Sequence, residues 1–183
     1  MPVREIVTVP DPILRAKAKK VPVVTPQIQV LIDDMVETMR QAPGVGLAAP
    51  QVGVGLRVIV VEYAEPSEDP EAEPKSPKLY AVVNPEITRQ SEATALGNEG
   101  CLSIPTYFGE VERREVVTVK GLDRNGRAFR LKAKGWLARI FQHEIDHLDG
   151  VLFTDRVKGP ENLWRVTPGQ EETEEEKKAE TLG

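Results

Sequence analysis

The chain has 183 residues, 40% of them hydrophobic, and a formal net charge of −5, so a single domain can bury a sizeable core on folding. Its one cysteine excludes an internal disulfide and favours a reducing compartment. No apolar run approaches the ~20 residues of a membrane span, and the N-terminal residues lack the apolar stretch of a secretory signal. We therefore expect an unprocessed cytoplasmic protein with no membrane partner.

The negative charge is concentrated in two segments. Residues 65–78 contain five acidic, two basic and four proline residues, which predicts a solvated loop inserted in the domain. Residues 171–180 contain six acidic and two basic residues, so the rest of the chain carries a net charge of +2. A nearly neutral body offers no basic surface for nucleic acid, and we expect a small or peptidic substrate with no direct nucleic-acid binding.

The first predicted element is an amphipathic helix near the N-terminus. Thr25 and Pro26 form a helix start signal, and apolar residues from position 28 to position 39 then recur with helical spacing. The pattern ends near Pro43 and Gly44.

Four later segments have the composition of strands. Residues 57–61 form a β-branched run typical of a buried strand, and residues 79–83 resemble a second one. Residues 110–120 and 128–132 are predicted to pair as a hairpin, because the Asp-Arg-Asn-Gly sequence at 123–126 contains a strong turn signal. The centre of the domain is therefore predicted to be antiparallel sheet.

The last predicted element is a helix over residues 136–147. Its apolar residues and both histidines recur with helical spacing, and Gly150 follows as a C-terminal cap. Two helices flanking separate strands indicate an α+β domain rather than alternating βαβ units. We place this single domain at residues 1–158 and expect residues 159–183 to form a polar, acidic tail that is partly disordered.

The second helix carries an H-E-x-x-H sequence made by His143, Glu144 and His147, which include the only two histidines of the chain. Histidines four residues apart lie about one helical turn from each other on one face, so both imidazoles can bind one metal ion. Glu144 can reach a water bound to that ion and accept its proton. A pattern this short also occurs by chance, but a glutamate between histidines on an otherwise apolar face would be poor core composition.

Cys101 is the obvious third ligand, because a hydrolytic metal site needs three protein ligands and one open position. Gly100, which precedes it, lets the backbone approach a neighbouring group closely. A lone cysteine is more commonly a small buried hydrophobic residue, so the residues by themselves leave both interpretations open.

Three segments together carry a family resemblance. They are Gly44–Gln51 (GVGLAAPQ), Glu99–Ser103 (EGCLS) and Gln142–Gly150 (QHEIDHLDG). In this order and spacing they resemble the signature motifs of the peptide deformylase family, and the similarity runs from about residue 3 to residue 157. The resemblance implies an α+β fold in which antiparallel sheets pack around a central helix that carries the H-E-x-x-H sequence.

The resemblance also implies a metal and its ligands. Cys101, His143 and His147 would hold one divalent ion per chain. This ligand set suits zinc by its softness but accepts other first-row ions. The family implies Fe²⁺ in the cell, readily replaced by Zn²⁺, Ni²⁺ or Co²⁺ in purified material.

The resemblance further assigns roles in catalysis. Glu144 would be the catalytic acid and base, and the Gln51 side chain and the Leu102 backbone N–H would contact the reacting carbonyl. Backbone groups able to pair with an extended peptide substrate are offered by Val45, Gly46 and Gly100. From the residues alone, 44–49 could instead be a tight turn and Gln51 a surface residue.

The implied reaction removes the formyl group from the N-terminal formyl-methionine of new polypeptides and releases formate. The implied partners are formyl-methionyl peptides and nascent chains near the ribosome, in the bacterial cytoplasm, with an organellar form left open. Trp136 and Ile140 either line the methionine pocket or belong to the core. Two alternatives remain: an H-E-x-x-H metallopeptidase, and a non-catalytic module with a structural metal, which would have to enlist a carboxylate as fourth ligand.

Overall fold

The structure is a computed structural model that describes residues 2–166 and 180–182. The α-helices are α1 (Pro26–Gln41) and α2 (Gly135–Leu148). The strands are β1 (Gly46–Ala48), β2 (Val58–Tyr63), β3 (Lys78–Gln90), β4 (Thr94–Cys101), β5 (Ile104–Arg114), β6 (Val116–Leu122), β7 (Ala128–Lys134), β8 (Leu163–Arg165) and β9 (Glu180–Leu182). Short 3₁₀ turns are η1 (Pro12–Arg15), η2 (Ala49–Val52), η3 (Phe153–Asp155) and η4 (Pro160–Asn162).

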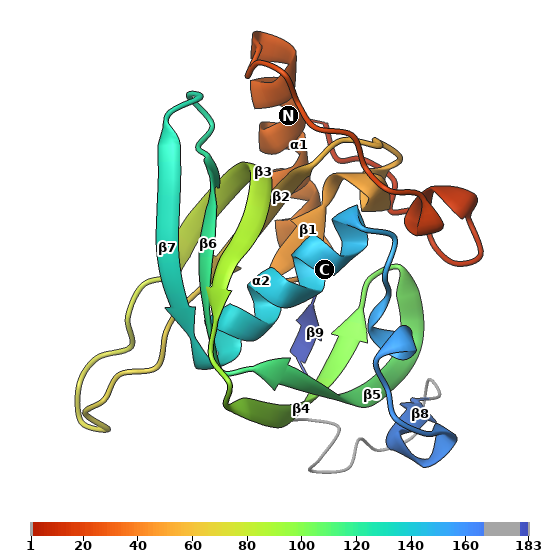
Figure 1. The fold of residues 1–183 in the computed structure, drawn as a ribbon, viewed down its shortest axis with the longest axis vertical. Helices are drawn as coiled ribbons and strands as arrows, with labels where there is room; N and C mark the ends of the chain where they lie inside the picture. The colour runs from red at the N-terminus through yellow and green to blue at the C-terminus, as the bar shows by residue number, and fades with distance from the viewer. Residues whose placement is uncertain (1, 167–179, 183) are drawn as a thin grey trace.

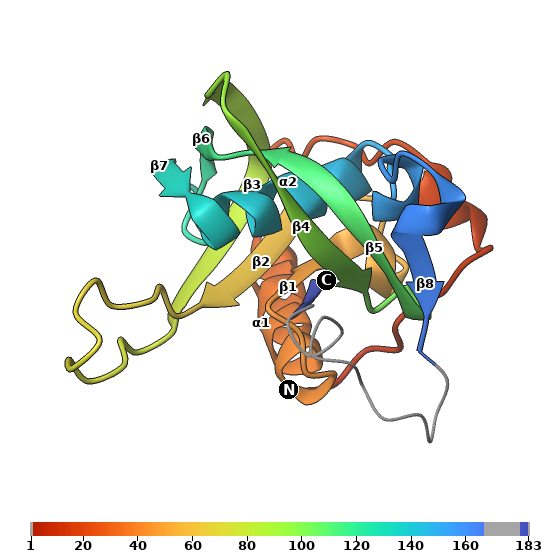
Figure 2. The same cartoon turned by 90° about the horizontal axis from the view of Figure 1, so that it is seen from below.

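The strands form two sheets with α2 between them (Figures 1 and 2). The larger sheet has the order β1-β2-β3-β6-β7, and its pairs are antiparallel. The smaller sheet has the order β8-β5-β4-β9, in which β9 runs parallel to β4 and the other pairs are antiparallel. Because α2 contacts strands of both sheets, the expected α+β arrangement of antiparallel sheets around a central helix is confirmed.

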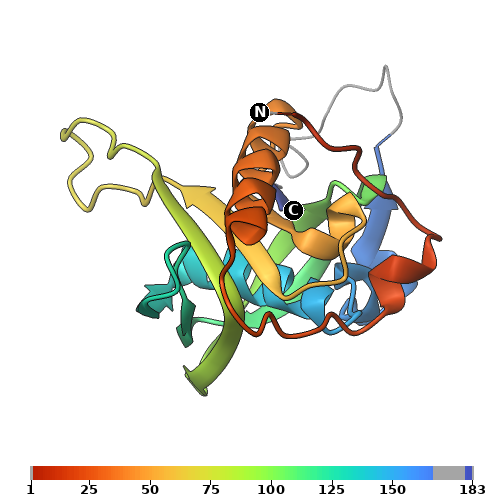
Figure 3. The same cartoon turned by 90° about the horizontal axis from the view of Figure 1, so that it is seen from above.

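Helix α1 begins where the start signal predicts. The Thr25 side chain accepts a hydrogen bond from the N–H of Ile28 at 3.4 Å, and Pro26 occupies the first turn, where its missing N–H costs nothing. The buried face of the helix packs on the larger sheet on the side opposite to α2 (Figure 3). Residues buried on this face include Ile28, Leu31, Ile32, Met35, Val36 and Met39.

The side chains of strand β2 are divided between two apolar clusters of the core. Ile59 and Val61 belong to the apolar cluster that includes much of α2, whereas Val58 and Val60 belong to the cluster that includes α1. Successive side chains of a strand point to opposite faces, so a continuous β-branched run is what a strand covered on both faces requires. All four side chains are fully buried.

One predicted strand was wrong, because residues 110–120 form parts of two strands in different sheets. β5 ends at Arg114 and β6 begins at Val116. Between them, the Glu115 N–H donates to the Ala93 carbonyl at 3.0 Å, and the Glu115 carbonyl accepts from the Gly135 N–H at 2.9 Å. Residues 112–115 at this crossing are Glu-Arg-Arg-Glu, with no glycine or proline among them, so no turn signal in the sequence marks the break. The predicted pairing with the strand that follows the Asn-Gly turn is confirmed by β6 and β7.

Strand β4, which ends at Cys101, was not predicted. Its sequence, Thr-Ala-Leu-Gly-Asn-Glu-Gly-Cys, contains two glycines and few residues of high strand propensity. Its pairing with β5 along most of its length determines its structure instead.

The acidic loop projects from the ends of β2 and β3, away from the rest of the molecule (Figures 1 and 2). Residues 64–77 form no helix or strand, and apart from Ala64 and Ser67 they are exposed. Across the described residues, neither helix has the length and apolar character needed to cross a bilayer.

The C-terminal segment returns to the smaller sheet. β8 pairs with β5, and β9 pairs with β4 on the opposite edge. Residues 167–179, part of the tail that we expected to be partly disordered, lie outside the described residues. The boundary at residue 158 remains a prediction.

Candidate metal centre

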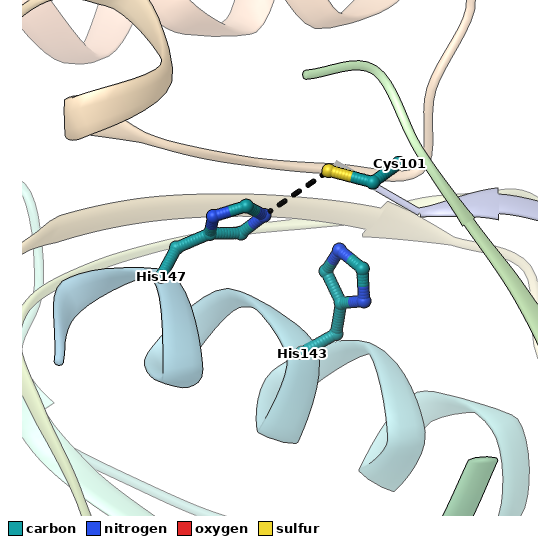
Figure 4. A group of neighbouring side chains, drawn as sticks. All are labelled: Cys101, His143 and His147. Atoms are coloured by element: carbon teal, nitrogen blue, oxygen red, sulfur yellow. Dashed lines mark hydrogen bonds between the residues drawn. The ribbon is translucent and has the colours of Figure 1, made fainter. Parts of the chain in front are cut away.

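The fold brings the three predicted ligands together. Cys101 is the last residue of β4, and His143 and His147 lie one turn apart on the face of α2 that points at this strand end (Figure 4). Their ligand atoms lie within 4.8 Å of one another, and the Cys101 Sγ is 3.4 Å from the His147 Nε2. All three side chains are at most 2% exposed. One thiolate and two imidazoles this close form a metal site with three protein ligands, the number that leaves a position open for chemistry.

A buried carboxylate, Glu99, orients one of the ligands. Its Oε1 lies 2.9 Å from the His143 Nδ1, which orients the ring so that its other nitrogen is the one able to bind a metal. Glu99 also accepts two hydrogen bonds from Arg113, both at 2.9 Å, and one from Arg139 at 2.7 Å. The three charged side chains are 0–5% exposed. A buried charge is tolerated when it is paired and hydrogen-bonded in this way.

The charge state of Glu99 follows from these contacts. Burial by itself raises the pKa of the carboxyl group. The hydrogen bonds and positive charge of Arg113, together with His143, outweigh burial and hold the pKa of Glu99 well below its usual range. Glu99 is therefore an ionised acceptor at neutral pH.

Arg113 extends the network to the middle of the H-E-x-x-H sequence. Its second Nη atom donates to the Asp146 carboxylate at 2.6 Å, and Asp146 also accepts from Arg156 at 2.6 and 2.8 Å. On the other side of α2, Arg57 donates to the Leu148 carbonyl at 3.0 Å. These contacts fix the rotation and the axial position of α2 relative to β4, and with them the positions of both histidines.

Gln51 points its amide nitrogen at the ligands. The side-chain carbonyl accepts from the Ala48 N–H at 2.9 Å, which orients the amide group. Its nitrogen lies 3.7 Å from the Cys101 Sγ and 3.1 Å from the Ser103 Oγ. Gln51 is fully buried, so the alternative that it is a surface residue is excluded.

Leu102 follows Cys101 directly, in the two-residue turn that joins β4 to β5. The register pairs Cys101 with Ile104 across this turn. The N-terminal segment holds the turn in place, because the Val9 N–H donates to the Ser103 carbonyl at 2.9 Å.

Glu144, which lies on α2, packs against the glycine motif at Gly46. Gly46 begins β1, an edge strand of that sheet, so the interpretation of 44–49 as a simple tight turn is incomplete. A side chain at Gly46 would overlap the Glu144 carboxylate, which is itself fully buried. The glycine therefore gives the carboxylate its place beside the backbone. The Val45 carbonyl accepts a hydrogen bond from the Glu62 N–H at 2.9 Å.

A cavity of about 210 Å³ lies beside Cys101 and the turn that follows it. It is lined by Cys101, Leu102 and residues 104–108. Ile140 is fully buried in the core cluster around α2, and Trp136 lines a separate hollow of about 420 Å³ together with Arg139. Neither borders the cavity at Cys101.

Sequence reasoning missed Glu99, Arg113, Arg139 and Ser103 as parts of the site. Glu99 had a detectable signal, because residues two apart in a strand share a face and Glu99 stands two before Cys101. Using that signal required β4 to be recognised as a strand. The arginines had no such signal, since they come from β5 and α2.

The fold and site together define a mononuclear metal enzyme of the H-E-x-x-H type with a cysteine as third ligand. A family model described as polypeptide deformylase matches residues 3–163. A peptide deformylase of Dehalococcoides mccartyi is 47% identical over 175 residues, which cover 96% of this chain and 98% of the relative.

Solved structures agree with the sequence match. A peptide deformylase from Ehrlichia chaffeensis in complex with actinonin matches with a TM-score of 0.78 at 42% identity, covering 88% of this chain and 92% of that one. A Met-Ala-Ser-bound class I type b peptide deformylase from Acinetobacter baumannii matches with a TM-score of 0.76 at 39% identity, covering 85% and 99%.

The chain belongs to the polypeptide deformylase family. It is a metal-dependent hydrolase that removes the N-formyl group from formylated peptides. The metal site is formed by Cys101, His143 and His147.

Proposed function

We propose that Glu144 moves the protons of deformylation, and that Gln51 and the Leu102 backbone N–H stabilise the oxyanion. The observation that supports this assignment is the position of Gln51, whose amide nitrogen is oriented toward the Cys101 thiol by the Ala48 N–H. A donor fixed before the reaction stabilises developing charge without reorganising. The loss of one such donor lowers kcat by about 10²–10³-fold in known cases.

The remaining activation of the formyl carbonyl and of the attacking water would come from a metal ion. Cys101, His143 and His147 would hold a divalent ion, which would polarise the formyl carbonyl and lower the pKa of the attacking water. Glu144 accepts the proton of that water and later returns it to the leaving amine, so that formate and a free N-terminus result. Its burial beside Gly46 keeps the carboxylate on the side of α2 that carries the histidines.

We propose ferrous iron as the ion in the cell, with zinc, nickel or cobalt as replacements after purification. The softness of the ligands permits all four ions, and the family resemblance favours iron. Protein purified without oxygen is expected to lose activity on exposure to air, whereas protein reloaded with nickel keeps it. Equal air sensitivity of both forms, or of neither, would contradict the assignment.

We propose that the substrate lies as an extended strand against backbone groups of Val45, Gly46 and Gly100. β1 and β4 are edge strands with respect to the antiparallel ladders of their sheets, which suits peptide binding by strand addition. The Acinetobacter relative was solved with Met-Ala-Ser bound. The substrates would be nascent chains near the ribosome in the bacterial cytoplasm, and residues 1–158 would form the catalytic domain.

The proposal is tested by formate release from formyl-Met-Ala-Ser. Glu144→Ala is expected to keep its fold and metal content yet lose nearly all turnover. Glu73→Ala, in the exposed acidic loop, is the matched control and should behave as the unaltered protein. Substantial turnover by Glu144→Ala would refute the proton-transfer role, and cleavage of an internal peptide bond instead of formate release would favour a metallopeptidase.

A further inference from the structure

The chain's own C-terminal segment lies against the strand that carries the metal-ligand cysteine. β9 pairs in parallel with the end of β4, in the register Glu99 with Glu180, Gly100 with Thr181, and Cys101 with Leu182. β9 also contacts α2. In both views the segment lies in the space between β1 and β4 (Figures 1 and 2).

This edge of β4 is the one that the proposed substrate needs. β5 occupies the other edge along its length, so a peptide can pair with Gly100 only where β9 now pairs. One strand edge accepts one partner, because each backbone N–H and C=O group forms its ladder bond with a single neighbour. The docked segment and a peptide paired with Gly100 therefore exclude each other.

We infer that residues 180–182 are an intramolecular ligand of the β4 edge and must leave it before a formylated peptide binds. This inference rests on the proposed mode of substrate binding. The interaction surface is the edge from Glu99 to Cys101, and its partner is an extended segment of the same chain. Backbone pairing tolerates different side chains, so the same surface can accept both the tail and diverse substrates.

Residues 180–182 belong to the same chain as β4, and this tether determines how often they occupy the β4 edge. A three-residue strand pairs weakly by itself, but a tethered segment faces its site at an effective concentration in the millimolar range. If the segment fills the edge about nine-tenths of the time, only one-tenth of the molecules are competent, and the apparent affinity for a peptide falls about tenfold. The substrate-bound complex forms only after the segment has left the edge, so kcat is expected to be unchanged.

Three variants of the full, metal-loaded protein test the inference. The first lacks residues 180–183, and the second carries Thr181→Pro with Leu182→Pro, which removes two backbone donors while keeping length and charge. The third lacks only Gly183, which lies beyond β9, and is the matched control. The Kd for Met-Ala-Ser is measured by calorimetry, and KM and kcat are measured with formyl-Met-Ala-Ser.

The first two variants are expected to bind Met-Ala-Ser about tenfold more tightly and to show a correspondingly lower KM, with the control unchanged. Equal Kd values in all proteins would overturn the inference. Tighter binding by the deletion alone would overturn strand pairing as its cause. If the Kd shifts as expected but no protein releases formate, tail docking stands and the proposed function fails.

Discussion

Replacing Glu99 by glutamine removes one negative charge from the centre of the buried network while keeping the size of the side chain. Arg113 and Arg139, which are 3% and 5% exposed, then lose the carboxylate that compensates them. Breaking a buried ion pair by removing one partner costs about 3–5 kcal/mol. Arg113 keeps its contact with Asp146 at 2.6 Å, so we expect the lower end, about 3 kcal/mol.

The same substitution should weaken metal binding. Glutamine cannot present two ionised oxygens, so the hydrogen bond that orients His143 loses its charge assistance. Changes to such orienting partners typically lower metal affinity by about 10–100-fold. The free energy of unfolding is measured by urea denaturation of the metal-free protein, and the metal Kd by competition with a chelator.

Glu112→Gln is the matched control for this experiment. Glu112 lies on β5 and pairs with Lys158 at 2.8 Å, but both side chains are exposed to solvent. Pairs of this kind contribute little to stability, so the control should resemble the unaltered protein in both assays. If Glu99→Gln unfolds within about 1 kcal/mol of the unaltered protein and binds metal equally well, the reasoning about the buried network is wrong.

Three further substitutions probe the site and its surroundings. Gly46→Ala should displace the Glu144 carboxylate and lower kcat by about 10²-fold with little change in stability, and an unchanged kcat would contradict the overlap. Cys101→Ser should lose its metal on dialysis, as measured by elemental analysis; full metal content would count against the thiolate ligand. Glu62→Gln should lower stability at neutral pH. The hydrogen bond from Arg40 lowers the pKa of Glu62 despite partial burial, so the stabilisation is present above the unfolded pKa of about 4.3 and disappears as the pH falls through the folded value. A difference from the unaltered protein that persists at pH 2 in urea titrations would show that another cause is involved.

The sequence by itself determined the features whose signals are local. Helical spacing and a start signal located α1 and α2, and the H-E-x-x-H sequence placed two imidazoles on one helix face, because these patterns depend on residues three or four apart. The joint occurrence of three motifs identified the family. The β-branched run of β2 indicated a buried strand for the same local reason.

The tertiary structure alone decided what depends on residues distant in sequence. Cys101 could have been ordinary core until the fold placed its sulfur 3.4 Å from the His147 ring, 46 positions away. Glu99 gained its role from contacts with Arg113 and His143, which lie 14 and 44 positions away. The division of residues 110–120 between two sheets, and the pairing of β9 with β4, likewise depend on which strands meet. Local periodicity carries no information about such meetings, because a strand's partner is selected by packing of the whole domain.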